Sequence, residues 1–274
     1  MNGRKFLIIT VIAICVFSLA YGIYYEISRT KMIRPTNDID NGNSSNDIYD
    51  FDALFDNNIN YQGYSVGSEN KQDTSKEIVY TIYKLNQSSE GKYDINVELP
   101  YININNKKII EINREIITLF GQKVQSILSD TNTANKQNVI YTVEYTSCVN
   151  ENILSVVIKS TLKEGSNAQR LIIQAYTYNL SSNEIIPLKT MIEIKGLDKA
   201  KVREQIRRVV QEGSEQSANL SALGYNVFVR DLNSDIYEIE NSNNYYLGPN
   251  GTIYIIYAYG NTRYTSEKDI VIIR

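Results

Sequence analysis

The sequence of 274 residues contains no histidine and no tryptophan, and it has only two cysteines. The missing histidine excludes Ser-His-Asp and Cys-His catalytic sites, the usual zinc sites, and the commonest general base near neutral pH. Catalysis by carboxylates alone or by a Ser-Lys pair remains open. The sequence therefore predicts no catalytic residue, no metal site and no cofactor.

The two cysteines lie in different parts of the chain. Cys15 belongs to an apolar run near the N-terminus, so Cys148 is the single cysteine of the remainder. No intrachain disulfide can form within that remainder, and its core has to be stable without one. Because Cys148 lies in an alternating apolar stretch, we expect a small buried side chain rather than a reactive thiol.

The apolar run extends from Phe6 to Tyr25 and contains no charged residue. About 20 helical residues rising 1.5 Å each cross a hydrocarbon core of roughly 30 Å. Basic residues flank the run on both sides, so their distribution does not set its orientation. The short segment before it is too small to be a domain, which favours a signal-anchor over residues 1–25. The protein is then a single-pass protein of the cell membrane with its bulk outside the cytoplasm.

A cleaved signal peptide is the alternative to a retained anchor. Ser18 and Ala20 provide small residues at the spacing that a signal peptidase accepts. Cleavage would release a secreted protein. Both interpretations export residues 26–274.

The charge is distributed unevenly along the chain. The net charge is −3, and residues 1–34 carry five basic residues against one acid, a balance of +4, so the remainder carries −7. An acidic exported body repels phosphate backbones and anionic lipid headgroups. The sequence therefore argues against a nucleic-acid partner and favours a cationic one.

Residues 26–75 are rich in Asn, Asp, Ser and Gly, which is typical of a disordered tether. The segment also contains a small group of apolar residues, namely Tyr49, Phe51, Leu54 and Phe55. We interpret them as isolated apolar residues within the tether, with a short docking segment as the alternative.

From residue 76 onward, hydrophobic periodicity predicts regular structure. Strands are expected at 78–83, 93–99, 139–146, 153–162, 170–180, 245–247, 252–259 and 269–273. One amphipathic helix is expected over 107–130, and another from 197 or 198 to Glu212, with Gly213 at its exit and a short helix over 214–221. Strands grouped around two main packing helices predict an α+β fold with a largely antiparallel sheet.

Several short motifs follow one another along residues 76–274. They are Leu99–Ile102, Ile112–Ile116, Ile153–Val156, Tyr176–Leu180, Ile186–Leu188, Tyr246–Gly251 and Tyr257–Gly260. The series resembles the exported region of bacterial RsiV-type anti-sigma factors and the non-catalytic N-terminal region of PdaC-type peptidoglycan deacetylases, a pair of domains of unknown function. The closing turn, strand and aromatic-Ala-aromatic-Gly corner are its most specific part.

The resemblance implies an α+β region at the cell envelope, divided into subdomains at 76–135 and 136–274. An RsiV-type regulator also has a cytoplasmic sigma-binding segment, for which Met1–Lys5 is too short. A PdaC-type enzyme has a further metal-dependent domain with histidine ligands, and this sequence has no histidine. We therefore expect the recognition module alone, on its anchor.

Two sets of residues are candidates for ligand contact. Tyrosine combines a large rigid surface with a polar tip, which suits stacking on sugar rings or a protein interface. The tyrosine candidates are Tyr245, Tyr246, Tyr257, Tyr259 and Tyr264. The acidic candidates for contact with a basic partner are Asp235, Glu238 and Glu240. The alternatives are packing inside a sheet for the tyrosines and a solvated edge for the acids.

These observations predict a non-enzymatic, membrane-anchored binding or sensing module of a bacterial cell envelope. Its expected ligands are peptidoglycan, the wall glycan, or a cationic, lysozyme-like wall-active protein. Two other functions remain open at this point. One is a cell-wall enzyme that works through carboxylates, and the other is the sensor subunit of a membrane signalling complex.

Overall fold

The computed structural model describes residues 50–56, 61–62, 71–130, 138–260 and 267–274. The predicted membrane span Phe6–Tyr25 and the first part of the predicted tether lie outside these residues. Within the described ranges, no helix is both long and apolar enough to cross a bilayer.

The larger of two sheets runs in the order β2-β3-β4-β5-β6-β7. Its strands are β2 (Val79–Ser89), β3 (Tyr93–Ile102), β4 (Val139–Asn150), β5 (Ile153–Glu164), β6 (Arg170–Asn179) and β7 (Glu184–Ile185). Neighbouring strands are antiparallel except β3 and β4, which are parallel because a helical crossover joins them. The short β1 (Tyr61–Gln62) adds to β4 in parallel.

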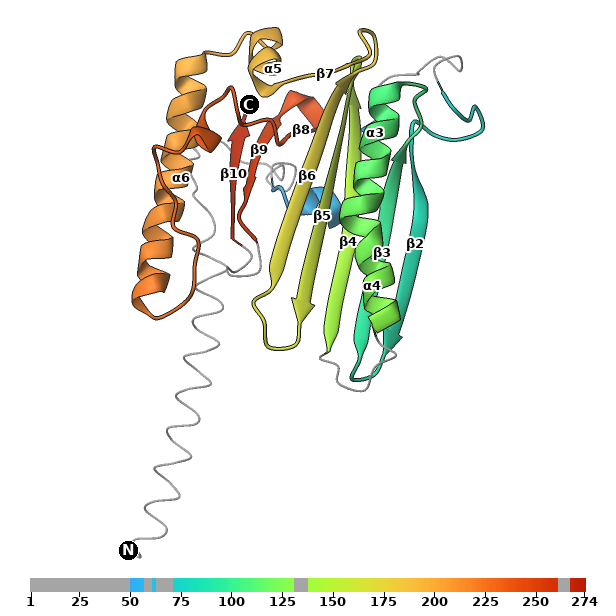
Figure 1. The fold of residues 1–274 in the computed structure, drawn as a ribbon. Coiled ribbons are helices and arrows are strands. Elements are labelled where there is room, and N and C mark those ends of the chain that lie inside the picture. The colour runs from blue at the N-terminus through green and yellow to red at the C-terminus, as the bar shows by residue number, and fades with distance from the viewer. Residues whose placement is uncertain (1–49, 57–60, 63–70, 131–137, 261–266) are drawn as a thin grey trace, which may run out of the picture. The chain divides into compact units, whose positions relative to one another are not determined.

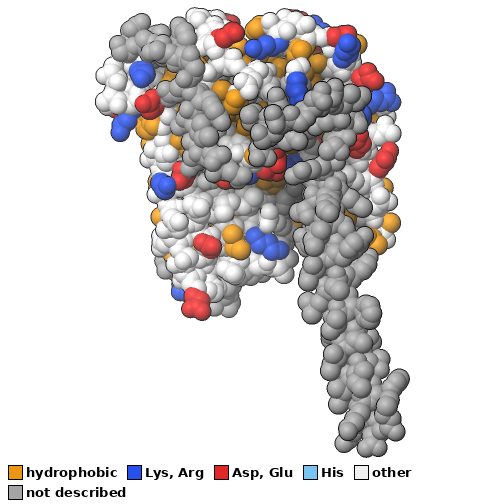
Figure 2. All heavy atoms as spheres, turned by 180° about the vertical axis from the view of Figure 1, so that it is seen from behind, with side chains coloured by type: hydrophobic (Ala, Val, Ile, Leu, Met, Phe, Trp, Pro, Cys, Tyr) orange, Lys and Arg blue, Asp and Glu red, His pale blue; other side chains and the backbone are white. Residues whose placement is uncertain are grey.

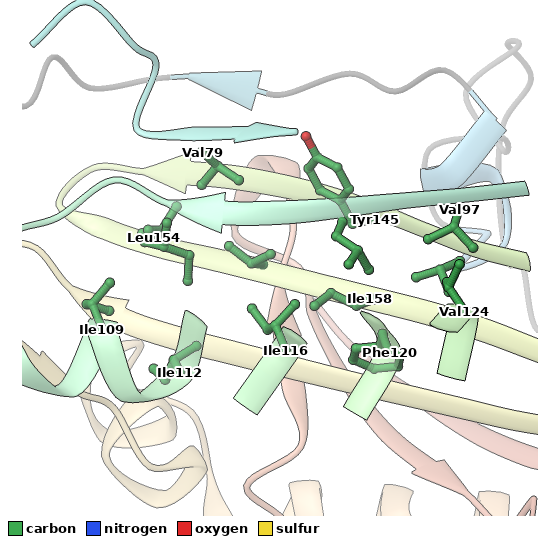
Figure 3. Packing of buried hydrophobic residues seen from close by; sticks show 14 of the residues in the cluster. Val79, Val97, Ile109, Ile112, Ile116, Phe120, Val124, Tyr145, Leu154 and Ile158 are labelled. Atoms are coloured by element: carbon green, nitrogen blue, oxygen red, sulfur yellow. The ribbon is translucent and has the colours of Figure 1, made fainter. Parts of the chain in front are cut away.

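The crossover consists of α3 (Lys107–Ile116), the π-helical turn η3 (Ile117–Gly121) and α4 (Gln122–Asp130). Asn106 caps its start, because the Lys108 backbone N–H donates to Asn106 Oδ1 at 2.8 Å. The apolar stripe of this segment is buried against one face of the large sheet (Figure 3). Its members are Ile109, Ile112, Ile116, Phe120 and Val124.

The smaller sheet contains β8 (Tyr245–Leu247), β9 (Ile253–Ala258) and β10 (Lys268–Ile273), all antiparallel, with β9 in the centre. One face packs against α5 (Leu188–Ile194) and α6 (Lys199–Ala222). The other face packs against the large sheet, where Tyr254 and Ile256 contact the cluster around Val157 and Ile173. The described body is therefore layered as helix, sheet, sheet and helix (Figure 1).

The predicted α+β class with largely antiparallel sheets is confirmed. The predicted division into subdomains at 135/136 stays a prediction, and the described structure links its two sides. The ladder of β3 with β4 crosses it, as does the core shared by residues such as Ile109 and Val156. Residues 46–274 accordingly form one compact unit.

The second long helix also differs from its prediction. α6 continues through Gly213 to Ala222 instead of ending at Glu212. Gly213 is buried, and a Cβ at this position would lie 2.5 Å from Asp269 Oδ1. The glycine therefore permits a close approach between helix and sheet, and it is not a helix terminator.

Part of the predicted tether is folded. Residues 53–56 form the single turn α2 (Ala53–Asp56), and the side chains of Phe51 and Phe55 are 4% and 6% exposed. The two rings, one just before the turn and one within it, enter the same core cluster. The docking alternative describes residues 50–56, and the tether over the rest of residues 26–75 stays a prediction.

Candidate functional site

Residues 223–244 connect α6 to β8 through one turn of 3-10 helix, η4 (Asp235–Tyr237). We call this connection the α6–β8 loop. Most connections in compact domains are about 4–6 residues long, and much longer ordered loops usually serve in binding. The α6–β8 loop is therefore the first part of the described surface to consider as a site.

The two sides of the loop differ in chemistry. Val227, Tyr237 and Ile239 point inward and are buried in or beside the core between α6 and the small sheet. Five large apolar side chains of the same loop are exposed instead. They are Leu223, Tyr225, Val229, Leu232 and Ile236, with Val229 77% exposed. Apolar side chains gathered on one ordered loop indicate an interaction surface more strongly than scattered ones do.

Arg230 holds the middle of the loop to β10. Its guanidinium forms a two-pronged ion pair with Asp269, with Nε 2.6 Å from Oδ2 and Nη2 3.0 Å from Oδ1. Only 4% of the Arg230 side chain and 6% of the Asp269 side chain are exposed. A planar guanidinium paired in this way restricts both distance and orientation. The pair thus fixes the backbone between Val227 and Leu232.

Further groups complete the polar cluster around Arg230. Ser217 of α6 accepts a hydrogen bond from Arg230 Nη1, and the Phe228 backbone N–H donates to Glu267 Oε2 at 3.0 Å. The Phe228 ring stacks on Tyr259 with centroids 4.4 Å apart. The loop is therefore attached to the helix and to the small sheet through polar and aromatic contacts.

The structure places the predicted tyrosines inside the protein. Tyr245, Tyr246, Tyr257 and Tyr259 are all buried, whereas Tyr264 lies outside the described residues. The side chains of β8 and β9 lie between the large sheet and the α5–α6 layer, so neither face of these strands is open. These four tyrosines therefore pack inside the fold, and their contact with a ligand stays a prediction.

Two of these tyrosines instead support the α6–β8 loop. The Tyr257 hydroxyl is 2.7 Å from Ser242 Oγ, and the Tyr259 hydroxyl is 3.0 Å from that of Tyr237. Tyr259 also donates to Asp269 Oδ2 at 2.8 Å. The tyrosine pattern in the sequence thus marks the inner support of the surface and not the surface itself.

These hydroxyls give the fold a predictable response to alkali. Burial raises the pKa of Tyr257 to about 12, and burial together with Asp269 raises the pKa of Tyr259 above its ordinary 10.0. A group whose pKa is raised by folding contributes stability below its unfolded pKa and loses that contribution as pH rises through its folded pKa. We expect the free energy of unfolding to fall between pH 10 and about 12.

Circular dichroism and tyrosinate absorbance, recorded on the same samples, check this expectation. We expect the folded signal to be lost cooperatively, over the same pH range in which the last tyrosines ionise. Full titration of every tyrosine while the folded signal persists would contradict the burial of these groups.

The predicted acidic contacts are exposed, but two of them have partners within the chain. Arg203 of α6 pairs with both Glu238 and Glu240, at 3.6 and 3.4 Å, and Lys189 lies 3.8 Å from Glu240. Exposed pairs of this kind contribute little to stability. In the described part of the chain, Asp231 and Asp235 make no ion pair.

The acids lie beside the apolar side chains of the same loop. Residues 223–244 contain four acids and a single arginine, and that arginine is the buried Arg230. The face of the body drawn in Figure 2 likewise mixes hydrophobic side chains with charges of both signs. Within the described ranges, no group of three or more Cys, Asp or Glu is arranged to hold a metal ion.

Sequence reasoning missed the apolar part of this surface and the acid Asp231. Tyr225, Val229, Leu232 and Ile236 recur at steps of four, three and four residues. That spacing is typical of a helix face packed in the core, so periodicity gave no signal for an exposed loop. One signal was present: a long stretch between α6 and β8 that combines large apolar residues with acids.

The arrangement as a whole defines an α+β protein with an ordered surface loop. No model of a known protein family matches the sequence, and no curated protein is significantly similar to it. Two solved structures of DUF3298 family proteins are similar at 10% sequence identity. The one from Pseudomonas aeruginosa PAO1 has a TM-score of 0.36 and covers 70% of this chain and 86% of its own. The one from Bacteroides fragilis has a TM-score of 0.37 and covers 70% of this chain and 89% of its own. The resemblance to RsiV-type and PdaC-type proteins stays a prediction.

Proposed function

We propose that the protein is a non-catalytic binding module, anchored in the cell membrane with its body outside the cytoplasm, that recognises a cationic wall-active protein. The α6–β8 loop is the contact surface. The observation that carries the proposal is the loop's two-sided construction, with Arg230 buried against Asp269 and apolar side chains turned outward.

This construction has the properties of a protein interface. Interfaces place apolar and aromatic side chains at the centre and polar groups at the rim. Here Tyr225, Val229 and Leu232 supply the apolar part, and Asp231 and Asp235 supply acidic groups. Because the buried ion pair orders the loop in advance, less conformational entropy is lost on binding.

The sign of the charge favours a basic partner. The sequence outside residues 1–34 carries a net charge of −7, and opposite charges speed association and orient the encounter. Lysozymes are the class of basic wall-active protein to which the resemblance to RsiV-type factors points. A glycan is a weaker candidate, because the four described tyrosines expected to stack on sugar rings are buried.

The first test measures binding of the full chain, in detergent micelles, to hen egg-white lysozyme. The wild-type chain should bind, and affinity should fall as salt is raised because the charges are screened. Replacing Val229 and Leu232 by aspartate should weaken binding by about tenfold or more, since central apolar contacts dominate interface energy.

Ile194→Asp is the matched control, because Ile194 is 54% exposed on α5 and lies outside the loop. We expect this variant to bind like the wild type. Equal binding by the loop variant, or no binding by any variant, would contradict the proposed partner.

Purified peptidoglycan separates this proposal from an enzymatic one. We expect no release of soluble glycan fragments during prolonged incubation with the full chain. Fragment release that disappears when a single carboxylate is replaced by its amide, with the fold intact, would establish the enzyme instead.

A further inference from the structure

The segment Phe51–Phe55 docks where the large and small sheets meet. Phe51 and Phe55 contact each other edge to face with ring centroids 5.5 Å apart, and the Phe51 ring lies 5.9 Å from that of Tyr254. The surface beneath them is apolar and comes from both sheets. It is formed by Cys148, Val157, Leu171, Ile173, Ala175 and Ile256. We call these residues the inter-sheet surface.

Two lysines, one from each sheet, bind the same segment. Lys159 of β5 lies 3.3 Å from Asp52 Oδ1, and Lys268 of β10 lies 2.6 and 2.5 Å from the two carboxylate oxygens. The lysine ammonium groups also lie over the rings, Lys159 at 4.3 Å from Phe55 and Lys268 at 5.5 Å from Phe51. Each lysine therefore contacts the acid and one aromatic ring.

The inter-sheet surface does not depend on the segment for its own structure. Its residues belong to β4, β5, β6 and β9, whose backbone hydrogen bonds run to other strands of the two sheets. The segment contributes only side-chain contacts and one helical turn. Without it, an apolar patch flanked by Lys268 and Lys159 would remain, with Lys159 still paired with Glu144 at 2.8 Å. Folded domains rarely leave such an apolar patch open.

We propose that the inter-sheet surface is an exchangeable peptide-binding site. Phe51–Phe55 occupies it in cis, and it accepts in trans a segment of the same chemistry, with two aromatic side chains four residues apart and an acid after the first. The assignment rests on these contacts alone and does not require the function proposed for the α6–β8 loop.

Two features make the segment exchangeable. A single helical turn is not stable alone, so α2 gains its order from docking. Asp52 is 53% exposed, and rim ion pairs contribute modestly. Occupancy in cis is then maintained largely by effective concentration, which is about millimolar for short connections. Recognition of a short amphipathic segment through aromatic side chains and one charge is a recurring binding mode.

Cys148 provides a reporter of occupancy, because it belongs to the same cluster as Phe51 and Phe55. Its thiol is buried, and burial raises its pKa to about 11. The thiolate is the reactive form, so docking should keep Cys148 unreactive. Replacing Cys15 by serine removes the other thiol of the chain.

The experiment uses the full chain carrying Cys15→Ser in detergent micelles. Phe51→Ala with Phe55→Ala opens the site, and the probe is a fluorescent peptide with the sequence of residues 50–56. We expect the peptide to bind the opened variant. It should bind the closed chain, which carries Cys15→Ser alone, at least tenfold more weakly. In the opened variant, bound peptide should restore protection of Cys148 from a thiol reagent. Ile117→Ala with Leu119→Ala, both exposed on η3, is the control that should leave the site closed.

Charge reversal tests specificity. A peptide with Asp52→Lys should bind the opened variant at least tenfold more weakly, and Lys268→Glu in the opened variant should restore its binding. No peptide binding to an opened variant with native circular dichroism would overturn the proposal, as would equal binding to the closed chain. If the double alanine variant does not fold, Asp52→Lys in the full chain opens the site with both rings retained, and the same outcomes apply.

Acid should weaken docking of the segment. Burial opposes ionisation of Asp52, but Lys268 and Lys159 outweigh it and hold the pKa of Asp52 below the ordinary 3.8. A lowered pKa stabilises docking above pH 3.8, and this contribution disappears as pH falls through the folded value. Binding of the peptide should therefore weaken only below about pH 4.

Discussion

Asp269→Ala is expected to lower the free energy of unfolding by about 3–5 kcal/mol, because it leaves a buried guanidinium without its counter-charge. Arg230 would lose both of its hydrogen bonds to the carboxylate, and Tyr259 would lose the acceptor of its hydroxyl. Glu267 lies 3.7 Å from Arg230 Nη1 and offers only partial compensation. Urea denaturation followed by circular dichroism measures the change.

Two further variants show whether the ion pair is responsible. Asp269→Ala combined with Arg230→Met should be more stable than Asp269→Ala alone, since the unpaired charge is removed. Glu240→Ala removes an acid paired at the exposed surface and should change stability by no more than about 0.5 kcal/mol. An effect of Asp269→Ala as small as that of Glu240→Ala would show that the cluster does not hold the loop.

Gly213→Ala is expected to destabilise the protein by about 1–3 kcal/mol through overpacking. The sign of this change in stability is informative, because replacing glycine by alanine inside a helix ordinarily stabilises the protein by up to about 1 kcal/mol. The added methyl group would lie 2.5 Å from Asp269 Oδ1 and 2.8 Å from Arg230 Nε. Both groups are buried and paired, so neither can move aside without weakening the ion pair. Chemical denaturation gives the free energy.

Asn219→Ala is the matched control on the same helix, because Asn219 is exposed and asparagine, like glycine, is a poorer helix former than alanine. Asn219→Ala should leave the stability unchanged or raise it slightly, as helix propensity alone predicts. The effects of Gly213→Ala and Asp269→Ala should also be non-additive, because the two residues are in contact. A stabilising Gly213→Ala would mean that α6 does not approach β10 as closely as the structure indicates.

The sequence predicted the repetitive parts of the fold well. The apolar stripe over 107–130 and the alternating strands lie where periodicity placed them, since burial of one face imposes these patterns. The predicted end of α6 was wrong because a glycine that ends a helix and a glycine that allows close packing look the same in the sequence. Gly213 shows the second case, and only the position of Asp269 distinguishes the two.

The candidate site was harder to predict because its residues act across long sequence separations. Tyr257 lies in β9 and Tyr259 just beyond its end, and the sequence alone does not show that layers cover both faces of that strand. The pairing of Arg230 with Asp269 joins residues 39 positions apart with no periodic signature. Glu238 and Glu240 looked like free acids because their partner, Arg203, belongs to a distant turn of α6.

The folded part of the predicted tether illustrates a different difficulty. Composition over residues 26–75 favours disorder, yet Phe51, Asp52 and Phe55 attach the described segment 50–56 to the two sheets. Average composition hides so short a motif. The lysines that complete it lie more than one hundred residues away in sequence, 107 for Lys159 and 216 for Lys268.

Hydrogen–deuterium exchange of the full chain, with and without hen egg-white lysozyme, tests the central claim most directly. We predict slower exchange over residues 223–240 in the complex, with the crossover helix over 107–130 unchanged as an internal reference. Slower exchange in other segments while the α6–β8 loop is unaffected, or no change anywhere at saturating lysozyme, would contradict the account.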